Sequence, residues 1–135
     1  MDTMTRWMLA GLLAIMVLGS DGAEANGWAA PRAVVQPSAF KGIHGLAVLD
    51  ERRLLAGTVV GNAIWEVDRA TGAAKVYIDG PEGQADDIAI GPKGELAWTS
   101  YIQGIVRYRE KEGAPIRVLA RDLTGINSLA FDMKT

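Results

Sequence analysis

A short pattern recurs along the chain at a nearly constant interval. The segments Gly45–Val48, Asp87–Ile90 and Ser128–Phe131 superpose at separations of 42 and 41 residues. Each begins with a small or polar residue, continues with an apolar run and is followed by turn-forming residues. Because the interval is kept along the chain, the fold must be built from copies of one supersecondary unit that pack beside one another.

The middle copy indicates what this unit is. Ile88–Ile90 and Leu96–Trp98 are short apolar runs separated by Gly91–Gly94, whose proline fixes φ and whose glycines tolerate positive φ. Two β-prone runs joined by such a turn predict a β-hairpin.

The repeat is longer than one hairpin. Leu54–Thr58 precedes Leu96–Ser100 by 42 residues, and Lys75–Ile78 precedes Arg117–Ala120 by the same interval. Four short β-prone runs separated by turns are typical of one blade of a β-propeller, which recurs at this spacing. The apolar residues recur at about every second position, which argues against a helical solenoid. The predicted fold class is therefore all-β, made of β-propeller blades.

The interval places two full blades at residues 44–78 and 86–120, and the first strand of a third blade from Asn127. A closed propeller needs roughly four to eight blades, because each blade buries its faces only against its neighbours. We therefore expect residues 43–135 to be an incomplete propeller, from a truncated reading frame or from a unit that completes a ring by oligomerisation. Both alternatives leave apolar faces or open blade edges that favour self-association.

The first 25 residues have the pattern of a secretory signal peptide. Arg6 precedes an apolar segment, Trp7–Ser20, and Ala23–Ala25 supplies the small residues of a cleavage site. The apolar core is shorter than the roughly 20 residues of a membrane span, which disfavours an uncleaved anchor. We expect a periplasmic or secreted protein in which residues 26–42 form an extended lead-in. Within it, Arg32–Val35 stands where the outermost strand of a preceding blade is expected, so it could close the ring.

Charge and composition exclude several classes of function. Residues 1–25 hold one of the 14 basic and three of the 16 acidic residues, so the mature chain carries 13 of each and attracts neither nucleic acid nor anionic membrane. The absence of cysteine excludes a disulfide framework, a redox thiol and a cysteine zinc site. The sequence also lacks a Gly-x-Ser-x-Gly elbow, a phosphate loop and a His-Glu-x-x-His pair.

Polar residues stand at the entrance to each predicted inner strand. The repeats align at two such positions, and their members are His44, Asp86 and Asn127 at the first and Gly45, Asp87 and Ser128 at the second. Inner strands line the channel of a propeller, so these side chains are expected to face a common axis. Carboxylate and amide oxygens with one imidazole suit a hard divalent cation such as Ca²⁺, with Zn²⁺ or Mn²⁺ as alternatives. Asp and Asn also bond nearby backbone at strand entrances, and a lone histidine can do the same.

The segments that open the blades resemble a known family. Gly42–Val48, Ala85–Leu96 and Gly125–Asp132 are similar to the blade-opening motifs of the six-bladed propellers of the gluconolactonase, senescence marker protein and luciferin-regenerating enzyme family. The resemblance covers residues 42–135. Related propellers, among them strictosidine synthase-like, paraoxonase-like and NHL-repeat proteins, open their blades in similar ways.

The resemblance implies a metal-dependent hydrolase of lactones or related esters. Asn127 matches a metal-ligating asparagine of the family, and Asp86 with Asp87 falls on an Asn-Asp pair, with Asp86 at the ligand position. His44 falls near the family's glutamate ligand, and no glutamate is there. The family's aspartate that acts as ligand and general base would lie beyond Thr135. The resemblance thus implies half of a metal site.

Two other functions stay open at this point. A non-catalytic propeller would bind a protein or a small ligand through loops such as Val59–Asn62 and Ser100–Gly104. An incomplete polypeptide would have no activity of its own, because its unpaired blade faces would lead to aggregation.

Overall fold

The computed structural model describes residues 29, 31–35 and 40–134. The chain divides into two compact units, residues 1–32 and 33–135, and all strands of the described residues belong to the second. The predicted signal peptide lies outside the described residues. In the part of the chain that the structure describes, no helix is long and apolar enough to cross a membrane.

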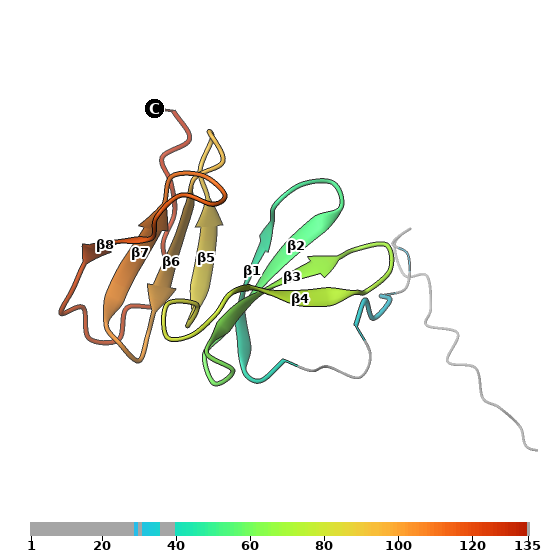
Figure 1. Cartoon of the computed structure of the whole chain (residues 1–135), viewed down its shortest axis with the longest axis horizontal. Coiled ribbons are helices and arrows are strands. Elements are labelled where there is room, and N and C mark those ends of the chain that lie inside the picture. The colour runs from blue at the N-terminus through green and yellow to red at the C-terminus, as the bar shows by residue number, and fades with distance from the viewer. Residues whose placement is uncertain (1–28, 30, 36–39, 135) are drawn as a thin grey trace, which may run out of the picture. The chain divides into compact units, whose positions relative to one another are not determined.

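Two four-stranded antiparallel sheets make up the second unit (Figure 1). The first sheet has the order β1-β2-β3-β4, with β1 (Ile43–Val48), β2 (Arg53–Thr58), β3 (Ala63–Asp68) and β4 (Ala74–Ile78). The second has the order β5-β6-β7-β8, with β5 (Asp87–Ile90), β6 (Leu96–Ser100), β7 (Ile105–Arg109) and β8 (Arg117–Ala120). Each strand pairs with the next in the chain, which is the meander of a propeller blade. The all-β fold class is confirmed, and the sheets fall on the two predicted blades.

The two blades share one register. Leu46 pairs with Ala56 in the first blade, and Ile88 pairs with Trp98 in the second, 42 residues later. A register shift interrupts the pairing of β3 with β4 and recurs at the equivalent point between β7 and β8. The sequence repeat is therefore also a repeat of backbone structure.

The turns and connections of each blade lie at its two ends. The end at which β1 begins and β2 finishes is named here the connector end, and there Ile43 pairs with Thr58. The same end holds the β2–β3 and β6–β7 turns and the connections that follow β4 and β8. Asn62 and Gly104 stand at equivalent places in those two turns with φ of 55° and 62°, a conformation that asparagine and glycine tolerate. The opposite end holds the other four turns of the two blades.

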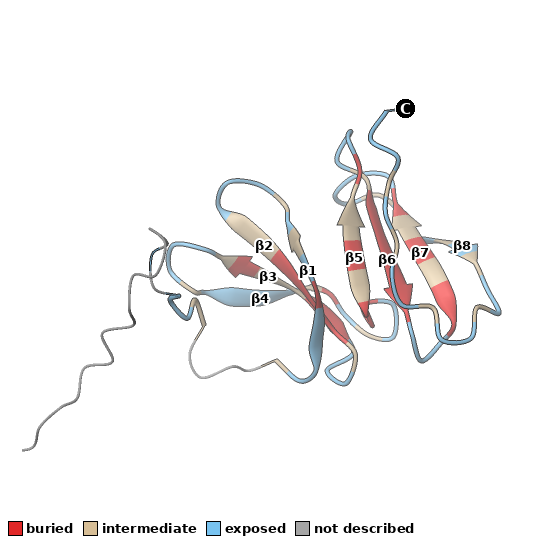
Figure 2. Ribbon diagram, turned by 180° about the vertical axis from the view of Figure 1, so that it is seen from behind, coloured by how far each residue is buried: buried red, intermediate tan, exposed pale blue. Residues whose placement is uncertain are grey.

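The core of the unit lies where the two blades meet (Figure 2). Its buried apolar side chains come from both sheets and from the connection between them: Leu55, Ile64, Ile78, Ala85, Ile88, Leu96 and Trp98. Trp98 is fully buried, and its indole nitrogen donates to the carbonyl of Glu82 at 2.8 Å. Burying a large apolar side chain contributes roughly 1.5–3 kcal/mol, so this cluster holds the blades together.

Gly45 marks the closest approach of the two inner strands. A Cβ atom there would lie 3.0 Å from the Cα atom of Asp87 and 3.1 Å from the carbonyl oxygen of Asp86. A side chain there would crowd the start of β5, which would have to shift. This explains why the first blade has glycine where the second has Asp87.

The far face of each blade, which points away from the other blade, carries an apolar groove. The groove of about 290 Å³ on the first blade is lined by Val34, Val35, Phe40, Ile43, Leu46, Leu54, Ala56 and Val67. The groove of about 260 Å³ on the second blade is lined by Ala97, Val106, Tyr108, Leu119, Leu129, Ala130 and Phe131. Val34, Val35 and Phe40 of the lead-in and residues 129–131 after β8 thus lie where neighbouring blades would pack. Residues 31–35 and 127–131 have no strand assigned, so their roles as ring-closing strand and third-blade strand stay predictions.

Candidate functional site

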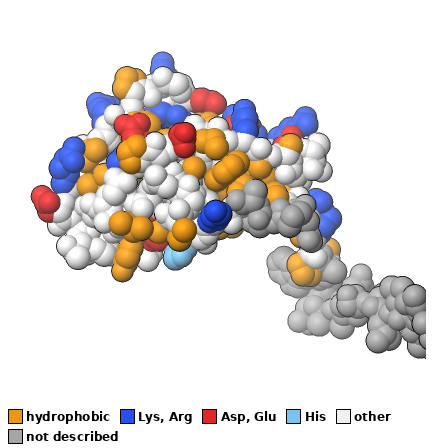
Figure 3. Space-filling model, turned by 60° about the horizontal axis from the view of Figure 1, so that its bottom comes forward, with side chains coloured by type: hydrophobic (Ala, Val, Ile, Leu, Met, Phe, Trp, Pro, Cys, Tyr) orange, Lys and Arg blue, Asp and Glu red, His pale blue; other side chains and the backbone are white. Residues whose placement is uncertain are grey.

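Two of the predicted site residues meet at the connector end. Nδ1 of His44 on β1 lies 2.9 Å from Oδ1 of Asp86, which directly precedes β5. The Asp86 side chain is 4% exposed and the His44 side chain is 57% exposed. Figure 3 shows the imidazole, in pale blue, on the surface at this end. Because Nδ1 faces the carboxylate, Nε2 is the ring nitrogen left for solvent or a ligand.

The neighbouring carboxylate of Asp87 bonds to backbone. Its Oδ1 accepts from the amide of Ile88 at 2.9 Å, and its Oδ2 accepts from the amide of Leu129 at 3.1 Å. The Asp87 amide donates to Oγ1 of Thr99 at 3.0 Å. Asp87 therefore joins the second blade to the segment that follows β8, a role that aspartate often has at strand entrances.

Asn127 lies in that following segment, with its side chain exposed. Its carbonyl oxygen accepts from Oγ1 of Thr99 at 2.6 Å, and its Oδ1 accepts from Oγ of Ser128 at 3.2 Å. Thr99 is thus bonded to the backbone of both Asp87 and Asn127. Of the four predicted ligands, His44 and Asp86 meet through their side chains, whereas Asp87 and Asn127 are linked through Thr99.

The donor types at the inner-strand entrances fit a divalent cation. Asp86 and Asn127 offer oxygen atoms and His44 offers nitrogen, but a Ca²⁺ ion takes six to eight oxygen ligands. A carboxylate beside an imidazole suits Zn²⁺ or Mn²⁺ better than Ca²⁺. Within residues 29, 31–35 and 40–134, no three His, Asp or Glu side chains are grouped to hold an ion. The metal site therefore stays a prediction.

A layer of buried polar residues beneath the entrances was missed from the sequence. Its members are Thr58, Gln84, Thr99 and Ser100. The hydroxyl of Ser100 donates to Oε1 of Gln84, and the backbone of Gln84 forms a bridge with that of Thr58. The signal that could have revealed this layer is the hydroxyl residue at the end of both second strands, since Thr58 and Ser100 are 42 residues apart.

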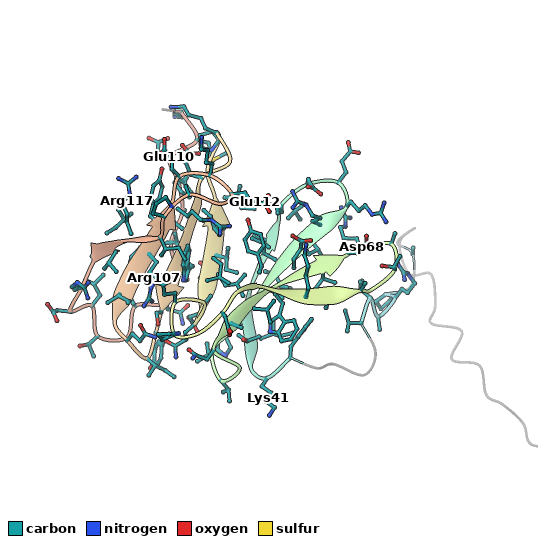
Figure 4. The ribbon with its side chains drawn as sticks, viewed as in Figure 1. Lys41, Asp68, Arg107, Glu110, Glu112 and Arg117 are labelled. Carbon is teal, nitrogen blue, oxygen red and sulfur yellow. The ribbon has the colours of Figure 1, made fainter. Side chains whose placement is uncertain are left out.

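The charged residues at the opposite end join the blades. Nη1 of Arg53 lies 3.3 Å from Glu66 of its own blade and 3.4 Å from Glu112 of the second blade, which is labelled in Figure 4. The guanidinium of Arg109 lies 4.5 Å from the ring centroid of Tyr77, another contact between blades. Burial raises the pKa of Tyr77, and the nearby Arg109 partly opposes this. Through these contacts, charged residues at this end help to hold the two blades together.

The two sheets and their shared register define a β-propeller protein. No model of a known protein family matches the chain, and no curated protein matches it. Among solved structures, streptogramin B lyase is similar at a TM-score of 0.53 with 13% identity, over 68% of this chain and 31% of that chain. A chain of a nidogen/laminin complex is similar at a TM-score of 0.51 with 21% identity, over 59% of this chain and 31% of that chain.

This chain thus spans about a third of the length of the propellers it matches. At such low identities the similarity shows the fold alone. One of the two proteins is named as an enzyme and the other comes from a protein complex. The matches support a β-propeller and do not single out the gluconolactonase family, which stays a prediction.

Proposed function

We propose that this chain belongs to an exported propeller hydrolase that cleaves ester or lactone bonds with the help of a divalent cation, and that His44 and Asp86 carry the proton transfer. The observation behind this proposal is the 2.9 Å contact between a buried carboxylate and an exposed imidazole. A buried aspartate at Nδ1 fixes the orientation and tautomer of the ring and leaves Nε2 to accept a proton. The blade-opening segments add the resemblance to lactone hydrolases.

The proposed hydrolysis uses the imidazole as base and then as acid. Nε2 of His44 takes a proton from water while the water oxygen attacks the carbonyl carbon of the ester. The imidazolium, stabilised by the Asp86 carboxylate, returns the proton to the leaving oxygen as the carbon–oxygen bond breaks. A divalent cation held by oxygens of Asp86 and Asn127 would polarise the carbonyl group.

The test is hydrolysis of a panel of lactones and 4-nitrophenyl esters by the purified full chain, with Ca²⁺, Mn²⁺ or Zn²⁺ supplied in turn. We expect His44→Ala to abolish turnover and Asp86→Asn to lower kcat by about 10²–10⁴-fold, because the ring loses its orienting partner. Glu82→Gln, which changes an exposed carboxylate in the connection after β4 at the same end, is the matched control and should have no effect. Absence of turnover with every cation would reject the proposal.

A non-catalytic binding propeller is the second candidate function. It is favoured by the exposed apolar side chains of the β2–β3 and β6–β7 turns. In that case Asp86→Asn and Asn127→Ala should leave ligand affinity unchanged in calorimetric titrations. Loss of binding in these two variants would favour the hydrolase instead.

A further inference from the structure

The two ends of the blades differ sharply in the chemistry of their turns. The charged residues of the turns all belong to the four turns at the opposite end: Asp50, Glu51, Arg52, Arg69, Lys93, Glu95, Glu110, Lys111 and Glu112. The β2–β3 and β6–β7 turns at the connector end carry no charge, because their sequences are Val-Val-Gly-Asn and Tyr-Ile-Gln-Gly. The connector-end charges belong to Lys41 and to the connections between blades (Figure 4 labels Lys41).

Three apolar side chains protrude from these uncharged turns and are named here the apolar collar. They are Val60, Tyr101 and Ile102, which are 72%, 49% and 66% exposed. Turn tips normally carry Gly, Asn, Asp or Ser, so exposed β-branched residues there do not follow from turn chemistry. Val60 and Ile102 occupy equivalent positions 42 residues apart, so both blades present the same feature.

Backbone and side-chain hydrogen bonds hold the collar in place. The amide of Val59 donates to the carbonyl of Gly42 at 2.9 Å, and that of Gly61 donates to the carbonyl of Lys41 at 2.9 Å. Val60 is thereby fixed beside the start of the strand that carries His44. A site that is already ordered loses less entropy when a ligand binds.

The second turn of the collar is anchored through Gln103. Its Nε2 donates to the carbonyl of Pro81 at 3.0 Å, and its Oε1 accepts from Nη2 of Arg107 at 2.7 Å. A recess of about 220 Å³ lies beside this turn, lined by Tyr101, Ile102, Gln103, Gly104, Asp122, Leu123, Thr124 and Gly125. The recess is smaller than the roughly 300–1,000 Å³ of pockets for drug-sized ligands. It therefore suits a short chain or a small ring.

The collar is too small for a stable protein interface. Such an interface buries roughly 800 Å² on each partner and involves about 20–30 residues on each side, whereas the collar has three side chains. A small molecule that also reaches the imidazole at the same end is the better match. Figure 3 shows hydrophobic side chains, in orange, beside the imidazole on this surface.

We propose that the apolar collar binds the acyl chain of the substrate, so that the preferred substrates are esters or lactones with an alkyl chain of medium length rather than polar sugar lactones. This inference rests on the proposed hydrolase function, because it assigns the collar to the substrate of His44 and Asp86. The carbonyl group would lie at the imidazole and the alkyl chain would extend over the turns.

The first experiment compares kcat/KM of the full chain for 4-nitrophenyl octanoate and 4-nitrophenyl acetate. We expect octanoate to be preferred by at least about tenfold, the discrimination that a few methylene groups give in an apolar site. The double variant Val60→Thr with Ile102→Thr should reduce that preference about fivefold or more, by lowering kcat/KM for octanoate and not for acetate. Both side chains stay β-branched but lose apolar surface. The control is Val48→Thr at the other end of β1, a valine that is 61% exposed.

The outcomes separate this inference from the function on which it rests. Equal rates for both esters would contradict acyl-chain binding by the collar, and so would an octanoate preference that the double variant keeps. Neither result would contradict the hydrolase function. If neither ester is hydrolysed, the proposed hydrolase function is rejected. Binding of the fluorescent acyl probe dansyl-undecanoic acid then tests whether the collar binds an acyl chain. Weaker binding by the double variant than by Val48→Thr supports an acyl site, and identical binding by both variants overturns it.

Discussion

At the scale of single residues, Asp86 and Asp87 are adjacent carboxylates with different partners. Successive side chains of a strand point to opposite sides, so the two cannot share one environment. Asp86 faces the imidazole of His44, and Asp87 accepts from the amides of Ile88 and Leu129. The sequence identifies both carboxylates as candidate site residues. Only the structure shows that Asp86 contacts the imidazole and that Asp87 bonds to backbone.

The role of Asp87 gives a prediction for stability. Asp87→Ala removes a charged acceptor for the amides of Ile88 and Leu129, so the free energy of unfolding should fall by about 1–3 kcal/mol. Urea unfolding followed by circular dichroism measures this change. Glu51→Ala removes an exposed carboxylate from a turn and is the control. Unchanged stability together with weaker Mn²⁺ binding in Asp87→Ala would show that the residue is a metal ligand instead.

At the scale of the structural element, Asp68 organises the β3–β4 turn. Its Oδ1 accepts from the amides of Ala70 and Thr71 at 2.9 Å each, and its Oδ2 accepts from Nε of Arg52 at 2.6 Å. The bond from the Thr71 amide, followed by the Arg52 guanidinium, lowers the pKa of Asp68 from its usual 3.8 to about 2. The folded-state pKa is depressed, so this contribution to stability is present above pH 4 and is lost as the pH falls toward 2.

This pKa shift predicts how an asparagine variant depends on pH. Asp68→Asn keeps a side-chain oxygen but removes the charge, so its Tm should be below that of the unmodified chain at pH 6. The difference should shrink between pH 4 and pH 2, where the native carboxylate also becomes neutral. Thermal unfolding at several pH values measures it, with Glu51→Gln as the control. A difference that stays constant down to pH 2 would contradict the assigned role of the charge.

The contact between blades depends on Trp98, which is fully buried at the centre of the shared core. Trp98→Ala should lower the free energy of unfolding by about 3–5 kcal/mol, because it leaves a cavity and also removes the hydrogen bond to Glu82. Leu119→Ala, on the exposed outer strand β8, should change it by less than about 0.5 kcal/mol. Similar effects of the two variants in urea unfolding would show that the blades do not share one core.

The repeat made most of the blade structure predictable. The 42-residue interval, the hairpin turn at Gly91–Gly94 and the alternation of apolar residues are local signals, and the structure has strands where they indicate them. The pairing of His44 with Asp86 was less accessible, because it depends on how closely β1 approaches β5. The interval places both residues at one end, but it does not determine which atoms meet. The structural role of Asp87 depends on Leu129, 42 residues away.

At the scale of the whole molecule, the outer faces of the two blades match the inner faces that pack against each other in the shared core. Ala97 and Val106 on the far face of the second blade correspond by the 42-residue register to Leu55 and Ile64, which the first blade buries in the shared core. Leu54 on the far face of the first blade corresponds to the buried Leu96. One copy can therefore place its second blade against the first blade of another.

This complementarity predicts association of head-to-tail type, in which two different surfaces meet and chains can extend. In sedimentation velocity experiments we expect species larger than a monomer to increase with concentration. Leu119→Lys should block the face of the second blade, and Leu46→Lys should block that of the first. Both residues are exposed on these faces, and Ile102→Lys is the control because Ile102 lies on a connector-end turn.

Mixing the two blocked variants distinguishes head-to-tail contact from pairing of identical faces. Each variant keeps one good face, and these faces are different, so the mixture should form dimers but nothing longer, although each variant alone stays monomeric. If identical faces paired instead, one of the two variants alone would still dimerise, because its self-complementary surface would be intact. A mixture that stays monomeric would contradict contact through these faces, since both partners of the head-to-tail interface are then present and fail to bind.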